Sequence, residues 1–331
     1  MIAKRKDDMN SSKLTCILLL TATLAHACQV PVFRYALERW EPGRYRVRVP
    51  AKVEVDPLAN AAVESAAEVT QIELYFPPKL RQAATTPIWT APMSQENVQR
   101  ALDSPLRREL SRRLLAGQSA VWVLLESGDA AKDDAAAKAI AAGIVAAQDK
   151  LKLPDGVITQ DEANDPQKRR ENADVLQSEL PLEIAFSTLR LSRQNAAEAA
   201  LIAMLMHLEP DLGDYATEPM VFPVFGRGRA LEPMIGKGIH ADNLLEAAAY
   251  LCGACSCEIK EQNPGIDLLM TADWAPVASR EVVETVQFVP DPVEPPKPEA
   301  KTLQRVVLIS MAAALLLKGW LISRRVLQRQ R

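Results

Sequence analysis

Histidine is scarce in this chain, and the usual nucleotide-binding fingerprints are missing. The 331 residues include three histidines, of which only His207 and His240 lie beyond the N-terminal 30 residues. No Ser/His/Asp order stands out, and neither a phosphate-loop nor a dinucleotide-binding glycine pattern is present. The formal net charge is −3, so the composition carries no signature of nucleic-acid binding. The signals that remain are two apolar ends, a regular order of strands and helices, and a cluster of cysteines.

The first apolar run has the pattern of a secretory signal peptide. A basic stretch (Lys4, Arg5, Lys6, Lys13) precedes apolar residues 14–24, and Ala25-His26-Ala27 offers a small-x-small cleavage site. We therefore predict that residues 1–27 are a signal peptide and that Cys28 is the first mature residue. Lipid attachment to Cys28 is an alternative, although Ala25 and His26 fit a lipobox poorly.

The second apolar run lies near the other end and predicts a single membrane-spanning helix over residues 304–323. Residues 306–322 are apolar except for Lys318, whose amine can extend toward the interface. Arginines at 324, 325, 329 and 331 follow, so the positive-inside rule predicts that the tail, residues 324–331, is cytoplasmic. An amphipathic C-terminal helix is the alternative. The Pro-rich, acidic composition around residues 290–298 predicts an extended linker over residues 286–303.

These ends predict a single-pass protein of a bacterial-type cell envelope, with an extracytoplasmic domain over residues 28–285. Its sequence alternates apolar strands with helices, which is typical of a layered α/β sheet. Strands are expected at residues 45–49, 71–76, 120–126, 182–189, 220–225 and 230–235, and helices at 105–117, 129–151, 195–208 and 242–252. Residues 50–92 have no clear overall pattern, and residues 154–180 read as a charged insertion.

The segment from residue 218 to 231 (EPMVFPVFGRGRAL), followed by Ile235-Gly236 and a helix over residues 243–251, resembles the C-terminal ββα unit of thioredoxin-like proteins. The resemblance implies a three-layer α/β sandwich over about residues 45–252, with insertions. It places Pro219 at the position of that family's cis-proline, which borders a substrate groove. Ser127 and Asp129 would lie on the same groove.

The family's catalytic CxxC follows the second strand, where the N-terminus of the next helix lowers a thiol pKa. The equivalent residues here are Glu126-Ser127-Gly128-Asp129-Ala130-Ala131, without a cysteine. The resemblance therefore implies a domain without the usual dithiol activity. We expect it to be a binding or adaptor protein with an envelope protein as its partner, and not an enzyme of the usual kind.

The cysteines leave three chemical alternatives open. Cys252, Cys255 and Cys257 follow the last helix, and Cys28 heads a Cys-Gln-Val-Pro stretch in an N-terminal arm. Structural disulfides are one alternative, and thiol-disulfide exchange through Cys252 and Cys255 is another. The third is a copper or zinc site on the three clustered cysteines, with Cys28 or His240 as a fourth ligand.

The turn Gly226-Arg227-Gly228-Arg229 also allows two interpretations. It can bind an anion, or it can be a charged hairpin turn in which the glycines supply positive φ values.

Overall fold

The computed structural model describes residues 28–77, 86–171, 174–255 and 259–278. Within these ranges no helix is both long enough and apolar enough to cross a membrane. The predicted signal peptide, linker and membrane helix all lie outside the described residues.

The central sheet is built on β5 (Ala120–Glu126), whose apolar sequence AVWVLLE predicts a strand covered on both faces. The sheet has the order β12-β10-β9-β5-β8, and β11 also pairs with β9. β8 runs parallel to β5, whereas β9 runs antiparallel to it. The other strands are β8 (Phe186–Ser192), β9 (Met220–Phe225), β10 (Arg229–Ala230), β11 (Met234–Ile235) and β12 (Ile266–Asp267).

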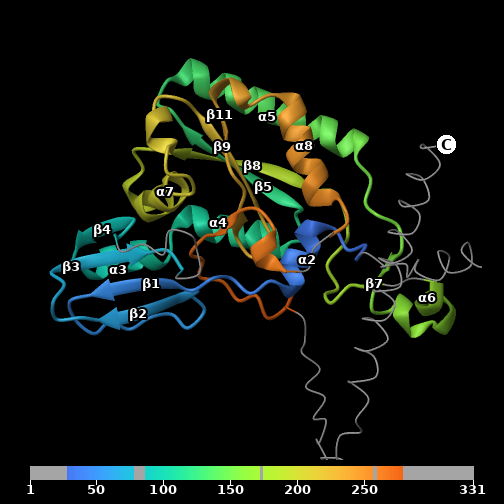
Figure 1. Ribbon diagram of the computed structural model, residues 1–331, viewed down its shortest axis with the longest axis horizontal. Coiled ribbons are helices and arrows are strands. Elements are labelled where there is room, and N and C mark those ends of the chain that lie inside the picture. The colour runs from blue at the N-terminus through green and yellow to red at the C-terminus, as the bar shows by residue number, and fades with distance from the viewer. Residues whose placement is uncertain (1–27, 78–85, 172–173, 256–258, 279–331) are drawn as a thin grey trace, which may run out of the picture. The chain divides into compact units, whose positions relative to one another are not determined.

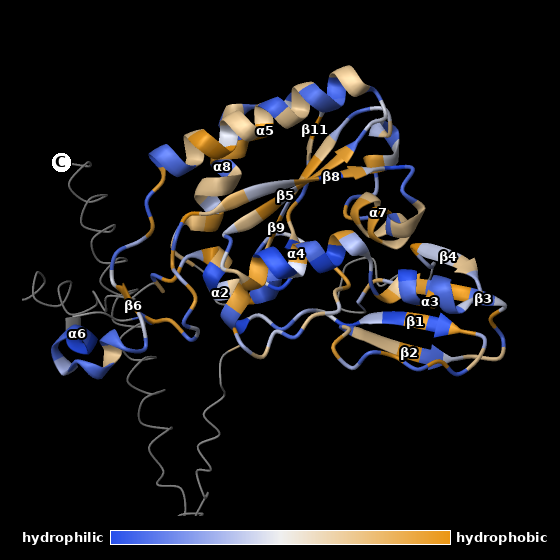
Figure 2. Ribbon diagram, turned by 180° about the vertical axis from the view of Figure 1, so that it is seen from behind, coloured by the Kyte–Doolittle hydropathy of each residue, from blue (hydrophilic) through white to orange (hydrophobic). Residues whose placement is uncertain are grey.

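Helices cover both faces of this sheet (Figure 1). α5 (Ala130–Lys150) and α8 (Ala241–Cys252) lie on one face, and α4 (Pro105–Leu115) and α7 (Ala199–Met206) lie on the other. Alternate residues of β5 belong to two different cores: Val121 and Val123 pack on the α4 and α7 side, and Trp122 and Leu124 pack on the α5 and α8 side. Figure 2 shows hydrophobic colours on α7 and β8, whereas α6 (Pro166–Glu171) is largely blue.

A second, smaller sheet has the order β2-β1-β3-β4. Its elements are β1 (Tyr45–Val49), β2 (Ala61–Ser65), β3 (Gln71–Tyr75) and β4 (Trp89–Pro92), and α3 (Gln95–Leu102) follows it. The strand at Tyr45–Val49 was expected to open the α/β series of the central sheet, and that expectation is wrong. Its partners come from the next 30 residues, where the sequence pattern is weak, so β1 pairs locally and buries only one face.

The chain after β12 joins the two sheets. Asn60, just before β2, accepts a hydrogen bond from the backbone N–H of Met270 (2.6 Å), and its own N–H donates to the Met270 carbonyl (3.1 Å). Arg107 of α4 is buried and donates to the carbonyl of Leu269 (3.1 Å). Burial lowers the pKa of Arg107 to about 10, so it stays charged at neutral pH. Side chains of both sheets consequently share one core.

Most predicted elements of the central sheet are confirmed, but two strands differ from the prediction. The strand expected at residues 230–235 is observed as two two-residue strands, β10 and β11, which pair separately with β9. Between the two pairings β9 carries Pro223, which has no N–H to donate to the ladder. The expected strand at residues 182–189 is observed as β8, Phe186–Ser192. The strand begins later than expected because the Ser119 hydroxyl accepts a hydrogen bond from the N–H of Ala185 and donates one to the Glu183 carbonyl, both at 3.0 Å. These side-chain bonds replace ladder bonds until Phe186 pairs with Ala120.

The remaining elements are short, apart from the N-terminal helix α2 (Val32–Arg39). They are β6 (Val157–Ile158), β7 (Asp174–Val175) and the 3₁₀ turns η1 (Glu162–Asn164), η2 (Ala196–Glu198), η3 (Leu212–Tyr215), η4 (Gly236–Gly238) and η5 (Lys260–Gln262).

Candidate functional site

The loop after β5 and the start of β9 meet at one end of the central sheet, where β5 ends and β9 begins. Leu125 of β5 pairs with Met220 of β9, so the residues just beyond this pair, Ser127 and Pro219, are neighbours in space. Asp129 caps α5 by accepting the N–H groups of Ala131 (2.9 Å) and Lys132 (3.2 Å). The three predicted groove residues Ser127, Asp129 and Pro219 therefore lie together at this end of the strands. We call this place, which is distinct from an outer strand of the sheet, the β5–β9 edge.

Asp133, one turn into α5, fixes the loop after β5 through hydrogen bonds to its carboxylate. The residue is only 3% exposed, and its carboxylate accepts the backbone N–H (2.7 Å) and the hydroxyl (2.8 Å) of Ser127 and the N–H of Gly128 (3.1 Å). The donors at the start of α5 are thus satisfied by two carboxylates of the chain itself. Sequence reasoning missed Asp133 because an Asp in the first turn of a helix is usually explained by the helix dipole alone.

Charged side chains complete the edge on the side of Pro219. Lys132 Nζ donates to Glu218 Oε1 (2.5 Å), and this hydrogen bond raises the pKa of Lys132. Arg193, in the loop after β8, donates to the Glu218 carbonyl (3.1 Å) and to Met206 Sδ (3.1 Å). Burial lowers the pKa of Arg193, and the charge of nearby Asp133 opposes that shift.

The described residues at this edge hold no thiol, and Glu218, the residue before Pro219, has its backbone engaged. Its N–H donates to Tyr215 (2.9 Å), and its carbonyl accepts from Arg193. The described chain has no cis peptide bond, so Pro219 departs from the family's cis-proline. The described part of this edge therefore presents the Lys132–Glu218 ion pair beside the capped start of α5.

The cysteine cluster lies away from the β5–β9 edge, beside the N-terminal arm. Pro31 forms an antiparallel bridge with Ala254, and the N–H of Cys255 donates to the Val30 carbonyl (3.0 Å). Cys28 and the described part of the cluster are therefore brought together. Cys257 lies outside the described residues.

Cys252 is a buried free thiol at the end of α8 and is 1% exposed. No disulfide joins it to Cys255, which is also buried. Burial raises the pKa of the Cys252 thiol to about 12, so it is protonated at neutral pH. Among the residues that the structure describes, no group of three His, Cys, Asp or Glu side chains is placed to hold a metal ion.

The two arginines of the hairpin turn clamp different segments, Arg227 the N-terminal helix and Arg229 the chain that leads into β12. Arg227 donates to the carbonyls of Leu37 and Glu38 at the end of α2, both at 2.8 Å. Arg229 binds Asp267 (3.1 Å) and the carbonyl of Asn263 (2.8 Å). Both side chains are nearly buried, and this turn acts as a structural clamp.

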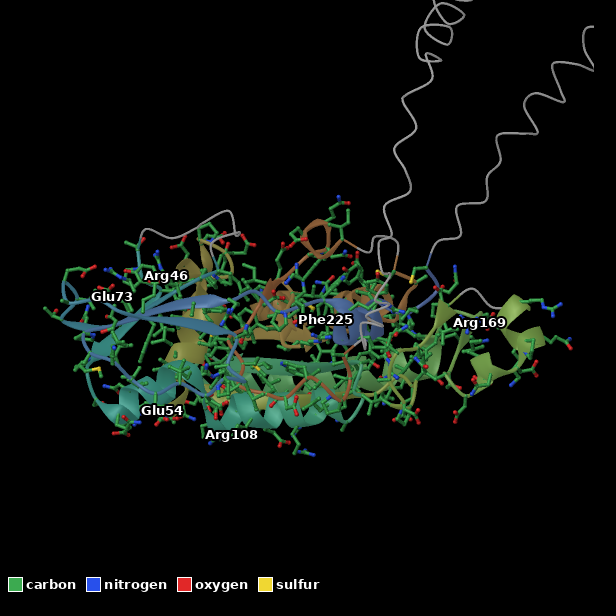
Figure 3. All side chains as sticks on the ribbon, turned by 90° about the horizontal axis from the view of Figure 1, so that it is seen from below. Arg46, Glu54, Glu73, Arg108, Arg169 and Phe225 are labelled. Atoms are coloured by element: carbon green, nitrogen blue, oxygen red, sulfur yellow. The ribbon has the colours of Figure 1, made fainter. Side chains whose placement is uncertain are left out.

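α2 is enclosed by segments that are distant in sequence, and Phe225 lies beside it (Figure 3). Arg34 and Glu38 are fully buried and form an ion pair (Arg34 Nε to Glu38 Oε1, 2.8 Å). Glu38 also accepts the N–H groups of Gln177 (2.9 Å) and Ser178 (3.0 Å). The charged insertion is thereby fastened to the N-terminal arm.

Comparisons with protein-family models, with curated proteins and with solved structures found no match to this chain. Its function is therefore inferred from its own residues.

Proposed function

We propose that this chain is a membrane-anchored, extracytoplasmic thioredoxin-like module that works by binding another envelope protein. The observation that carries the proposal is the β5–β9 edge. There, two carboxylates of the chain occupy the start of α5, where the family places its dithiol.

The strand order supports the thioredoxin-like part of the proposal. In chain order β5, α5 and β8 form a βαβ half, with β6, α6 and β7 inserted between α5 and β8. After α7, β9, β10 and α8 form a ββα half, and β8 and β9 lie on either side of β5. The first strand of the family's sheet has no counterpart beside β8 in the described chain, so the likeness is to the family's core.

The state of the cysteines favours binding over thiol chemistry. An exchange reaction needs an accessible thiolate, whereas Cys252 is buried and its pKa is raised to about 12. Copper or zinc binding through Cys252, Cys255 and Cys257 is a separate hypothesis, and anaerobic titration with either metal would test it. Stoichiometric binding that is lost in Cys255→Ser would support a metal site.

The export and membrane parts of the proposal rest on the signal-like segment and the apolar segment with its arginine tail. A fusion of alkaline phosphatase after residue 279 is expected to be active in cells, because that enzyme needs an oxidising compartment. An inactive fusion, with an active control fused to a known exported domain, would contradict export.

Binding is tested by placing a photo-reactive amino acid at Thr217, beside Pro219, in the full chain. We expect irradiation of cells to yield an adduct with another envelope protein. If Thr217 gives no adduct while the variant is present at normal levels, the β5–β9 edge is not a binding surface.

A further inference from the structure

We propose that the outer edge of β8 joins two copies of this chain by antiparallel strand pairing. β8 ends the strand order of the central sheet, so the described chain supplies no strand on its outer side. It is seven residues long, and residues 187–190 are all half-exposed or exposed. A long edge strand of this kind is a template for pairing with another strand.

The backbone groups that point outward follow from the ladder with β5. The carbonyl of Ala185 accepts from Ser119, so Ser187, Leu189 and Leu191 bond to β5 by alternation. The same alternation turns the N–H and C=O groups of Thr188 and Arg190 outward. Arg113 of α4 confirms this direction for Thr188, since it donates to that carbonyl (3.1 Å).

Arg113 does not close the edge. A carbonyl oxygen has two lone pairs, so the Thr188 carbonyl can accept a second hydrogen bond while Arg113 stays in place. The other outward groups of Thr188 and Arg190 have no described hydrogen-bond partner.

The side chains select a second copy of the same strand. Arg190 is paired with Glu126 (2.5 Å) and Asp134 (2.9 Å). On α4, beside the strand, Glu109 is paired with Arg112 and Arg113, both at 2.7 Å. Three arginines therefore balance three carboxylates, and the edge offers no net charge to recruit a basic or acidic strand. Antiparallel pairing about a two-fold axis at Leu189 sets Thr188 opposite Arg190 of the other copy, and no like charges are directly opposed.

The same register covers an incompletely buried apolar side chain. Leu189 packs on the shared core from its rim. On the two-fold axis Leu189 lies opposite Leu189 of the second copy in a non-hydrogen-bonded pair, the kind of pair in which side chains approach most closely. Leu189 of one copy then contacts Leu189 of the other.

The test is a cysteine placed on the axis. In a non-hydrogen-bonded pair the Cα atoms are about 4.5 Å apart, within the range that a disulfide spans. We expect the purified full chain with Leu189→Cys, in detergent solution, to form a covalent dimer under mild oxidation. The wild type and Gln148→Cys, on the exposed end of α5, report the background from native cysteines and from collision.

A second variant separates the interface from folding. Thr188→Pro removes an outward N–H, and an edge strand tolerates proline at such a position. We expect light scattering to give a dimer mass for the wild-type chain and a monomer mass for Thr188→Pro with unchanged circular dichroism. A monomeric wild type, a dimer that persists in Thr188→Pro, or a Leu189→Cys chain that forms no more covalent dimer than Gln148→Cys would each overturn the proposal.

Discussion

Replacing Asp133 by alanine should destabilise the chain far more than replacing its neighbour Asp134. Asp133 accepts three hydrogen bonds from Ser127 and Gly128 and is nearly buried, whereas the Asp134 side chain is 69% exposed and pairs with Arg190 at the surface. A buried donor left without a partner costs about 1–3 kcal/mol. Gly128 is exposed, so water replaces its bond, and the Ser127 groups dominate the loss.

The expected loss for Asp133→Ala is therefore about 2–3 kcal/mol. Asp133→Asn keeps one acceptor without the charge and should lose about half as much, and Asp134→Ala should change the stability by less than about 0.5 kcal/mol. Urea unfolding followed by tryptophan fluorescence measures these differences. With a slope of about 3 kcal/mol/M, the midpoint of Asp133→Ala should fall by roughly 1 M. Equal midpoints for Asp133→Ala and Asp134→Ala would refute the closed loop.

Three further predictions concern the arm, the hairpin and the cysteines. Gly226→Ala should lower the free energy of unfolding by about 1–3 kcal/mol, because φ is +58° and an added Cβ meets the Cβ of Ala36 at 2.7 Å. Gly213→Ala, with open space around it, should be nearly neutral in the same unfolding assay. Glu38→Ala should cost about 3–5 kcal/mol by leaving a buried guanidinium unpaired, and a loss below 1 kcal/mol, measured by urea unfolding, would contradict that. Cys252 should resist alkylation at pH 8 until denaturant is added. Because the pKa of Cys252 in the folded chain is raised to about 12, its contribution to stability is complete below pH 9 and is lost as the pH rises toward 12. Rapid alkylation of the native chain would refute the burial of Cys252.

Local patterns in the sequence predicted much of the central sheet. The run AVWVLLE indicated β5, the helix expected at residues 105–117 is observed as α4, and the apolar residues before the glycine turn indicated β9. Each of these signals acts within a few residues.

The misplaced features depend on contacts between distant residues. β1 has the same alternation whichever sheet it joins, and its partner strands lie in a stretch with little pattern. The role of Arg227 depends on α2 lying 190 residues earlier in the chain. The helix α3 was missed because it is short, although Ser94 caps it in the ordinary way.

The candidate site was predicted in part. The cysteine-free loop and Pro219 were named from their positions, and the structure places them at one edge. Asp133, Lys132 and Arg193 were not named, because their roles come from bonds to Ser127 and Glu218 that spacing does not reveal.

The central claim is that the chain binds a partner through the β5–β9 edge. Its most direct test compares photo-crosslinking in cells from Asp129, at that edge, with crosslinking from Gln148, at the far end of the same helix. Both positions are exposed, but Asp129 also caps α5, so the labelling is compared only when both variants keep the circular dichroism of the wild type. A discrete adduct from Asp129 that is absent from Gln148 is the predicted result. Equal labelling from both positions, or none from Asp129, would contradict the claim.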